Sequence, residues 1–268
     1  MIKIKLQIEV IQLNVTQGDF EKNLDLMEEH INNRNSKSKL LVFPQYTITG
    51  YPTFKILDLL SNNFDYIISK ICGMAKRYKT GLLFSIPKSI GNNLFQDQIL
   101  YINKEGVIET TYIRIKKFWR EDNCITGNKI QIIVVDNIKI GIIAGDDIYY
   151  PEISNQLSKN GVNCIICLFY NAKRNLCGNH FDLGYVLKSL VTSLAVINEI
   201  DFVLCSATGI IDHDDNQSII AGATLVGNSM MASISESKEI FTDNDKNSFV
   251  AVIDDCKLEF YRMINRRN

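Results

Sequence analysis

The chain has 268 residues, of which 46% are hydrophobic and 22% are charged, with 29 basic and 30 acidic side chains. This length fits one large α/β domain over residues 1–268, although two smaller domains would also fit it. The near-zero net charge gives no reason to expect nucleic acid or an anionic membrane as partner, and no apolar run approaches the roughly 20 residues of a membrane span.

The first half of the chain alternates between strand and helix patterns. Residues 1–8 alternate apolar and polar side chains as a strand does, which does not resemble a signal peptide. Residues 16–19 offer capping groups for a helix whose apolar positions run from Phe20 to Ile31 at helical spacing. A strand at 40–43, a helical face over 64–78 and a strand at 81–86 follow, so we predict α/β layering.

The second half predicts hairpins as well as helices. Turn residues separate expected strands at 94–102 and 107–115, and again at 130–135 and 138–144. A helix over 151–159, a buried strand over 162–169 and a helix over roughly 181–200 precede closing strands at 202–206, 219–226, 230–234 and 249–253. Hairpins require mixed sheets, so we predict two mixed β-sheets face to face with helices outside.

The cysteines and histidines do not form a recognisable metal site. Seven cysteines, an odd number scattered along the chain, predict a reducing, cytoplasmic setting. Cys164 and Cys167 have CxxC spacing but lie in an apolar strand with no second pair, so we interpret them as core residues. His30, His180 and His213 belong to no motif. We therefore expect no metal and no cofactor.

Three segments place polar residues at the ends of predicted strands. In Leu41–Pro52, the strand breaks at Pro44 and leaves Gln45 beyond its end. In Tyr112–Asp122, alternation sends Arg114 to the same face as Tyr112 and Lys116. Gly141–Glu152 turns at Gly145 and continues through two acids into Pro-Glu, a usual first helical turn. Side chains and helix amides converge at such strand ends, so these segments predict a site.

Together the three segments resemble the carbon-nitrogen hydrolase (nitrilase) superfamily. Its catalytic Glu, Lys and Cys follow one another in this chain order, in a Phe-Pro-Glu segment, a Tyr-x-Lys strand and an Ile-Cys turn leading to Pro. The resemblance implies an αββα sandwich, two mixed β-sheets flanked by helices, often paired as a dimer across a helical face.

Within that superfamily the chain is most similar to the glutaminase domain of glutamine-dependent NAD synthetases. The similarity rests on Thr49–Pro52 followed by Asp58–Leu60, and on Gly145–Ile148 against that group's Cys-Glu-Asp-[Ile/Leu]. The likeness covers nearly the whole chain, and no ATP-pyrophosphatase domain follows Asn268, so we expect a free-standing relative.

All three triad-equivalent positions are substituted: Gln45, Arg114 and Gly145 stand where the family has Glu, Lys and Cys. A neutral amide cannot accept the thiol proton, and glycine has no side chain to attack a carbonyl or nitrile carbon. Arginine can still stabilise an oxyanion electrostatically but stays protonated near pH 7. We therefore expect no intact catalytic residue.

Each remaining candidate has a structural interpretation beside the functional one. In the structural interpretation, Gln45 does no more than hydrogen-bond a neighbouring loop. Arg114 does no more than form an ion pair with Asp146, Asp147 or Glu121. Asp147 matches an acid of the family turn, whose structural role is helix capping. If those acids pair elsewhere, Arg114 would anchor a small carboxylate-bearing ligand, with Gln45, Glu121, Asp146 and Asp147 around it.

Three functional hypotheses remain open from the sequence. The favoured one is a catalytically inactive pseudoenzyme that acts as a binding or assembly protein, as a homodimer or in a heteromer with an active relative. The second is a divergent enzyme, such as an amidohydrolase that acts on the C–N bond of a small amide, which uses Arg114 with Asp146, Asp147 or Cys167 in a rearranged site. The third is an amidase whose site is completed by a partner subunit.

Overall fold

The protein is described by a computed structural model that places residues 5–118, 121–173, 183–210, 223–233 and 248–254. Its largest sheet has the order β14 (Ser248–Asp254), β1 (Lys5–Ile11), β2 (Leu40–Val42), β3 (Gly81–Gly91), β4 (Leu94–Ile102) and β5 (Ile108–Ile113). The second has the order β13 (Met230–Ala232), β10 (Asp201–Ser206), β8 (Cys164–Phe169), β7 (Ile138–Ala144) and β6 (Gln131–Val135). A small third sheet joins β11 (Thr208–Ile210), β12 (Thr224–Val226) and β9 (Ala172–Lys173).

Both large sheets are mixed, as the hairpin pattern predicts. β1, β2 and β3 run parallel, while β14, β4 and β5 pair antiparallel to their neighbours. In the second sheet β7, β8 and β10 are parallel and the edge strands β6 and β13 are antiparallel. The family resemblance and the sequence pattern thus gave the correct fold class.

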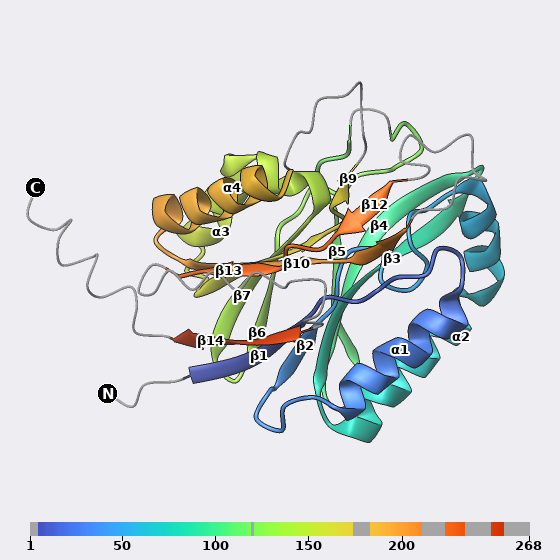
Figure 1. Ribbon diagram of the computed structural model, residues 1–268, viewed down its shortest axis with the longest axis horizontal. Coiled ribbons are helices and arrows are strands. Elements are labelled where there is room, and N and C mark those ends of the chain that lie inside the picture. The colour runs from blue at the N-terminus through green and yellow to red at the C-terminus, as the bar shows by residue number, and fades with distance from the viewer. Residues whose placement is uncertain (1–4, 119–120, 174–182, 211–222, 234–247, 255–268) are drawn as a thin grey trace, which may run out of the picture.

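Helices cover the outer faces of the two large sheets (Figure 1). α1 (Phe20–Asn32) and α2 (Phe54–Tyr78) lie on the six-stranded sheet, and α3 (Pro151–Lys159) and α4 (Leu183–Asn198) lie on the five-stranded one. A third apolar layer fills the space between the sheets, where residues such as Ile8, Val42, Ile140 and Ile166 meet. The order of layers is helix, sheet, sheet, helix.

Several boundaries differ from the sequence expectation. α2 begins at Phe54, ten residues before the predicted face, because Thr53 caps it and Ile56, Leu57 and Leu60 extend its buried side. The strand expected at 219–226 is β12, and 219–222 lie outside the described residues. The short strands β9 and β11 carry too few residues to show a period, so the pattern did not predict them.

Two further expectations concern single features. No helix in the described ranges is long and apolar enough to cross a membrane. His30 lies near the end of α1, where burial lowers its pKa, and His180 and His213 lie outside the described residues. The expectation of one domain over residues 1–268 stays a prediction.

Candidate functional site

The first segment turns sharply after β2. Gln45 and Tyr46 follow Pro44, and Tyr46 has a left-handed backbone with φ of 55°. This turn directs the Gln45 side chain inward, where 2% of the residue is exposed. Its Nε2 donates a hydrogen bond of 2.5 Å to Asp97 Oδ2. The position at which the sequence resemblance predicts the family's general base is therefore occupied by a buried amide that serves as a donor.

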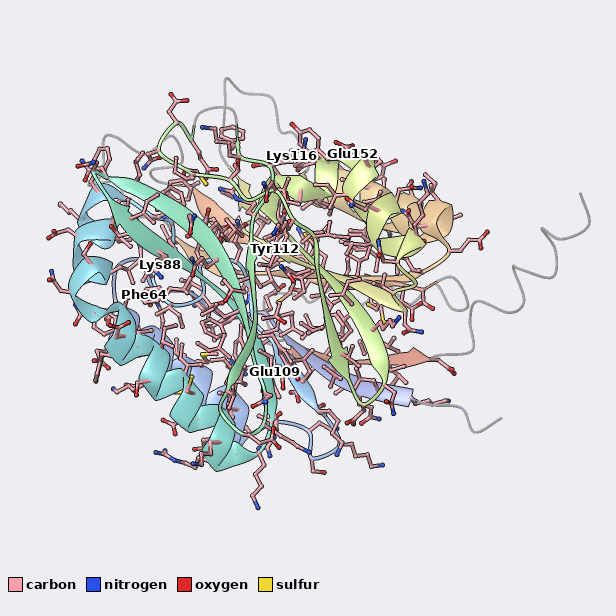
Figure 2. All side chains as sticks on the ribbon, turned by 180° about the vertical axis from the view of Figure 1, so that it is seen from behind. Phe64, Lys88, Glu109, Tyr112, Lys116 and Glu152 are labelled. Carbon is pink, nitrogen blue, oxygen red and sulfur yellow. The ribbon has the colours of Figure 1, made fainter. Side chains whose placement is uncertain are left out.

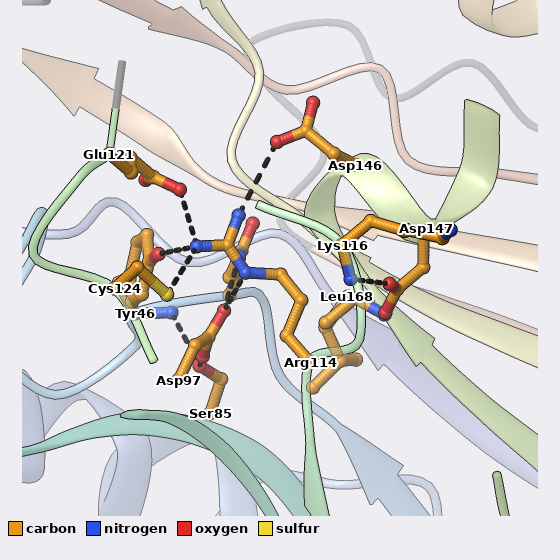
Figure 3. A network of polar contacts seen from close by, with 12 residues as sticks. Tyr46, Ser85, Asp97, Arg114, Lys116, Glu121, Cys124, Asp146, Asp147 and Leu168 are labelled. Atoms are coloured by element: carbon orange, nitrogen blue, oxygen red, sulfur yellow. Dashed lines mark hydrogen bonds and ion pairs between the residues drawn. The ribbon is translucent and has the colours of Figure 1, made fainter. Parts of the chain in front are cut away.

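Arg114 lies just past the end of β5 and is the centre of the site (Figure 3). Its Nη2 is 2.5 Å from Glu121 Oε2, its Nε is 3.2 Å from Asp97 Oδ2, and its Nη1 is 3.4 Å from Asp146 Oδ2. The Nε–H does not point at the Asp97 oxygen well enough for a hydrogen bond, so that contact is an ion pair by distance alone. Nη2 also donates to the Tyr46 hydroxyl at 3.3 Å.

The environment keeps this guanidinium charged. Burial by itself would lower the pKa of Arg114, but Tyr46, Glu121 and Asp97 outweigh burial and raise it well above the ordinary value. Only 2% of the Arg114 side chain is exposed. A buried guanidinium is stable only when it is paired, and here carboxylates of the same chain supply the pairing.

Asp97 is the member of the site that the sequence analysis missed. It lies in β4, is completely buried, and accepts from Ser85 Oγ at 2.7 Å as well as from Gln45. Burial raises the pKa of Asp97, while Arg114 and the two hydrogen bonds oppose that shift. The sequence did contain a signal for Asp97. It is a charged residue on the same strand face as Phe95 and Ile99, where alternation predicts an apolar side chain, and a charge at such a position indicates a buried polar contact.

Gly145 begins the 3-10 helix η1 (Gly145–Tyr149) at the end of β7. Its φ of +51° is a left-handed conformation that favours glycine. A Cβ atom at this position would lie 2.9 Å from Gln45 Nε2 and 3.1 Å from Arg114 Nη1. The structure thus brings Gln45, Arg114 and Gly145 together, with the ends of the first two side chains next to the position that a Cβ atom on Gly145 would occupy.

Asp147 belongs to a different network. Its carboxylate accepts from Tyr112 Oη at 2.5 Å, from the backbone N–H of Lys116 at 2.7 Å and from the backbone N–H of Ala144 at 3.1 Å. Burial raises the pKa of Asp147 to about 6, although these hydrogen bonds oppose the shift. Asp147 therefore joins the ends of β5 and β7 and does not pair with Arg114.

Lys116, expected on the same face as Arg114, points toward α3. Its Nζ is 3.5 Å from Glu152 Oε1 and 4.3 Å from the centre of the Tyr150 ring, and Figure 2 shows Lys116 and Glu152 near one another. The side chain is 34% exposed and the Glu152 side chain 64%. Lys116 is thus a partly exposed residue at the edge of the site, and its ammonium group does not lie beside Gly145.

Two buried cysteines lie near the site. Cys124 Sγ is 3.3 Å from Arg114 Nη2, yet burial raises the pKa of this thiol to about 11. Cys167 is completely buried in β8, its Sγ donates to the carbonyl of Leu168, and burial raises its pKa well above the ordinary value. Only a thiolate attacks efficiently, so neither environment prepares a nucleophile.

The described residues contain no group of three or more His, Cys, Asp or Glu side chains arranged to hold a metal ion. The five described cysteines, Cys72, Cys124, Cys164, Cys167 and Cys205, are free thiols. What the arrangement does is hold one guanidinium among three carboxylates and an amide. The Gln45 amide and the two Arg114 Nη atoms are engaged with these carboxylates, while Arg114 Nε makes no hydrogen bond and the Asp146 side chain is 22% exposed.

Comparison of the chain with known proteins identifies its family. The model of the carbon-nitrogen hydrolase family matches residues 7–232. The chain belongs to this family. It is 26% identical over 274 aligned residues to a glutamine-dependent NAD(+) synthetase of Thermotoga maritima, an alignment that covers 93% of this chain and 44% of that protein. The chain therefore spans less than half the length of this relative.

Solved structures of the nitrilase superfamily have the same fold. A variant of the Nesterenkonia AN1 amidase matches with a TM-score of 0.77 at 16% identity, covering 98% of this chain and 96% of that one. A second variant of the same amidase, in which the acetamide moiety of fluoroacetamide is attached to the active-site cysteine, matches with a TM-score of 0.77 at 17% identity and the same coverage. At such identities the likeness establishes the fold and leaves the activity open.

Proposed function

We propose that this chain is a catalytically inactive member of the carbon-nitrogen hydrolase family that acts as an assembly or binding protein. The observation that carries the proposal is the occupied space at Gly145, where Gln45 Nε2 and Arg114 Nη1 lie 2.9 Å and 3.1 Å from the position of a Cβ atom. Acyl transfer needs a nucleophile, its base and room for the substrate carbonyl between them.

The alternative of a rearranged amidohydrolase has less support. Cys124 and Cys167 are the thiols nearest the site, and burial raises the pKa of each. A nucleophile from a partner subunit would need access to Arg114, whose side chain is 2% exposed and already paired. The hypothesis of a small carboxylate ligand on Arg114 stays a prediction. It required a guanidinium without a partner in the protein, whereas Arg114 is paired to Glu121 and Asp97.

An assembly role has a candidate surface on α4. Lys188 is the only charged residue between Leu183 and Asn198, and three of the exposed side chains are apolar: Tyr185 is 69% exposed, Val196 58% and Ile197 71%. The other exposed positions, Ser189, Thr192 and Ser193, are small and uncharged. A face with a single charged side chain can meet a copy of itself with little repulsion of like charges, as a two-fold dimer requires. We infer a homodimer through this face, or a heteromer with an active relative that uses it.

The catalytic half of the proposal is tested by ammonia release from glutamine, simple amides and nitriles, against a buffer blank. We expect no release above the blank. Turnover approaching that of ordinary enzymes, with a median kcat of about 10 per second, would contradict the proposal.

A further inference from the structure

The charges in the site do not balance. One guanidinium, that of Arg114, lies within 3.4 Å of carboxylate oxygens from Asp97, Glu121 and Asp146. The first two carboxylates are 0% and 4% exposed. If all three are ionised, two negative charges remain uncompensated in a region with little water, and such charges are costly to bury.

Asp146 is the carboxylate best placed to relieve this imbalance. It has the longest contact with Arg114, 3.4 Å against 2.5 Å for Glu121 and 3.2 Å for Asp97. Its side chain is 22% exposed, so water can reach it to deliver or remove a proton. It also lies in η1, a short 3-10 segment that begins at the left-handed Gly145.

Groups from several elements surround Asp146. Those that affect its ionisation, or are affected by it, are Arg114 after β5, Glu121 in the loop that follows, Asp147 and Tyr149 in η1, and Cys167 in β8. Arg114 is the cation among them, and it is shared with Asp97 and Glu121. Lys116, the next basic residue in the chain after Arg114, is directed to Glu152 and Tyr150.

We propose that Asp146 is a proton-controlled latch for the segment Gly145–Tyr149. With a proton on its carboxyl group, the side chain stays beside Arg114, and η1 keeps the conformation seen in the structure, which we call the closed form. When the proton leaves to water, the carboxylate is repelled by Glu121 and Asp147, only weakly held by a guanidinium that is already shared, and drawn outward to solvent. The segment then opens more often.

The direction of this equilibrium agrees with the electrostatics of the closed form. Burial, the largest cause, and then Glu121 and Asp147 raise the pKa of Asp146 to about 6, against the opposing effect of Arg114. The closed form therefore binds the proton more tightly than an open form with an ordinary carboxyl group, and raising the pH favours opening. The latch is independent of whether the chain is catalytic.

Hydrogen exchange of the wild-type protein tests the latch. We expect the protection of backbone amides in residues 145–149 to fall by about tenfold between about pH 5 and about pH 7.5, after correction for the intrinsic rate, because each unit of pKa difference is worth a factor of ten. Asp146→Asn, which imitates the protonated form, should reduce this dependence to the part contributed by Asp147, whose pKa is also raised to about 6 by burial. Asp136→Asn, at the exposed β6–β7 turn, is the matched control and should keep it.

A carboxyl-carbon NMR titration of the wild type serves as a second readout that needs no variant. We expect the Asp146 resonance to titrate near pH 6. Titration below about 4.5, near the ordinary range of an aspartate, would overturn the proposal. So would pH-independent protection of 145–149, or the same dependence in Asp146→Asn as in the wild type.

Discussion

At the scale of single residues, the site is explained by what each substituted side chain now contacts. Gln45 donates to Asp97, and Arg114 is paired to Glu121, Asp97 and Asp146. These contacts form a buried polar network that links Gln45 to Arg114 through Asp97. The consequences of changing one member can be stated with a direction and a size.

Arg114→Ala should destabilise the protein strongly. It leaves Asp97 and Glu121 buried without their cation, and breaking a buried pair in this way costs about 3–5 kcal/mol of unfolding free energy. The matched control is Arg77→Ala, since Arg77 pairs with Glu28 on the surface with 68% of its side chain exposed. That change should cost less than about 1 kcal/mol. Urea unfolding of both variants measures the difference, and equal losses would show that the buried network is not stabilising.

Gly145→Cys should lose stability without gaining activity. The added Cβ would meet Gln45 Nε2 at 2.9 Å, and a left-handed backbone costs a side-chain-bearing residue roughly 1–2 kcal/mol. The new thiol would also lack a carboxylate base. Thermal unfolding and ammonia release together check this, with Gly161→Cys as control, because that glycine has φ of +75° but nothing within 4 Å. An active Gly145→Cys protein would mean that the remaining pocket activates a thiol unaided.

At the scale of elements, the sequence predicted most of the helices and strands but not the place of Asp97 in the site. Long periodic segments such as β4, β7 and α3 were predicted to within a residue or so, because burial on one face imposes their period. Asp97 was missed because its role depends on a contact with Gln45, 52 positions away in the sequence, which alternation cannot reveal. Pairing of Arg114 with Glu121 and Asp146 was one of the open alternatives, and only geometry could choose it.

The hydrogen bonds of Asp147, which connect the ends of β5 and β7, give a prediction at this scale. Asp147 accepts from Tyr112 and from backbone amides of Ile115, Lys116 and Ala144, which joins one sheet to the other. Asp147→Ala should therefore cost roughly 2–4 kcal/mol, whereas Tyr112→Phe, which removes one partner, should cost about 1 kcal/mol. Equilibrium unfolding in urea measures both. If the two variants were equally stable, the connection between β5 and β7 would not depend on the backbone amides.

At the scale of the whole molecule, two properties follow from the site and from the outer face of α4. One is the dependence of stability on pH: the raised pKa values of Asp146 and Asp147 mean that these two groups lower the stability as the pH rises, whereas a carboxylate with a lowered pKa raises it. The other is assembly. Both can be measured on the intact chain.

Asp146→Asn should become more stable relative to wild type as the pH rises. The folded pKa of Asp146 lies above its unfolded value, so the folded state binds more protons between them, and the wild type loses about 1 kcal/mol from this group between about pH 5 and about pH 7.5. His30, whose pKa burial lowers, acts in the opposite direction in both proteins and cancels in the difference. A difference that stays constant with pH would contradict this.

Light scattering should give at least twice the chain mass of 30.5 kDa. Ile197→Glu, which places a charge on the apolar face of α4, should shift the protein toward monomer. Tyr66→Glu is the control on the opposite helix layer, where Tyr66 is 47% exposed on α2, and it should leave the mass unchanged. If Ile197→Glu kept the mass while Tyr66→Glu reduced it, the assembly face would lie on α2.

The most direct test of the central claim, that no nucleophile works in this site, is the intact mass of the protein after incubation with an excess of amide, nitrile and fluoroacetamide. Unlike ammonia release, a mass shift cannot come from a contaminating amidase. We predict an unchanged mass under conditions in which an active amidase is fully modified. A stoichiometric adduct mapped to Cys124 or Cys167 would contradict the account and show that the site holds a reactive thiol.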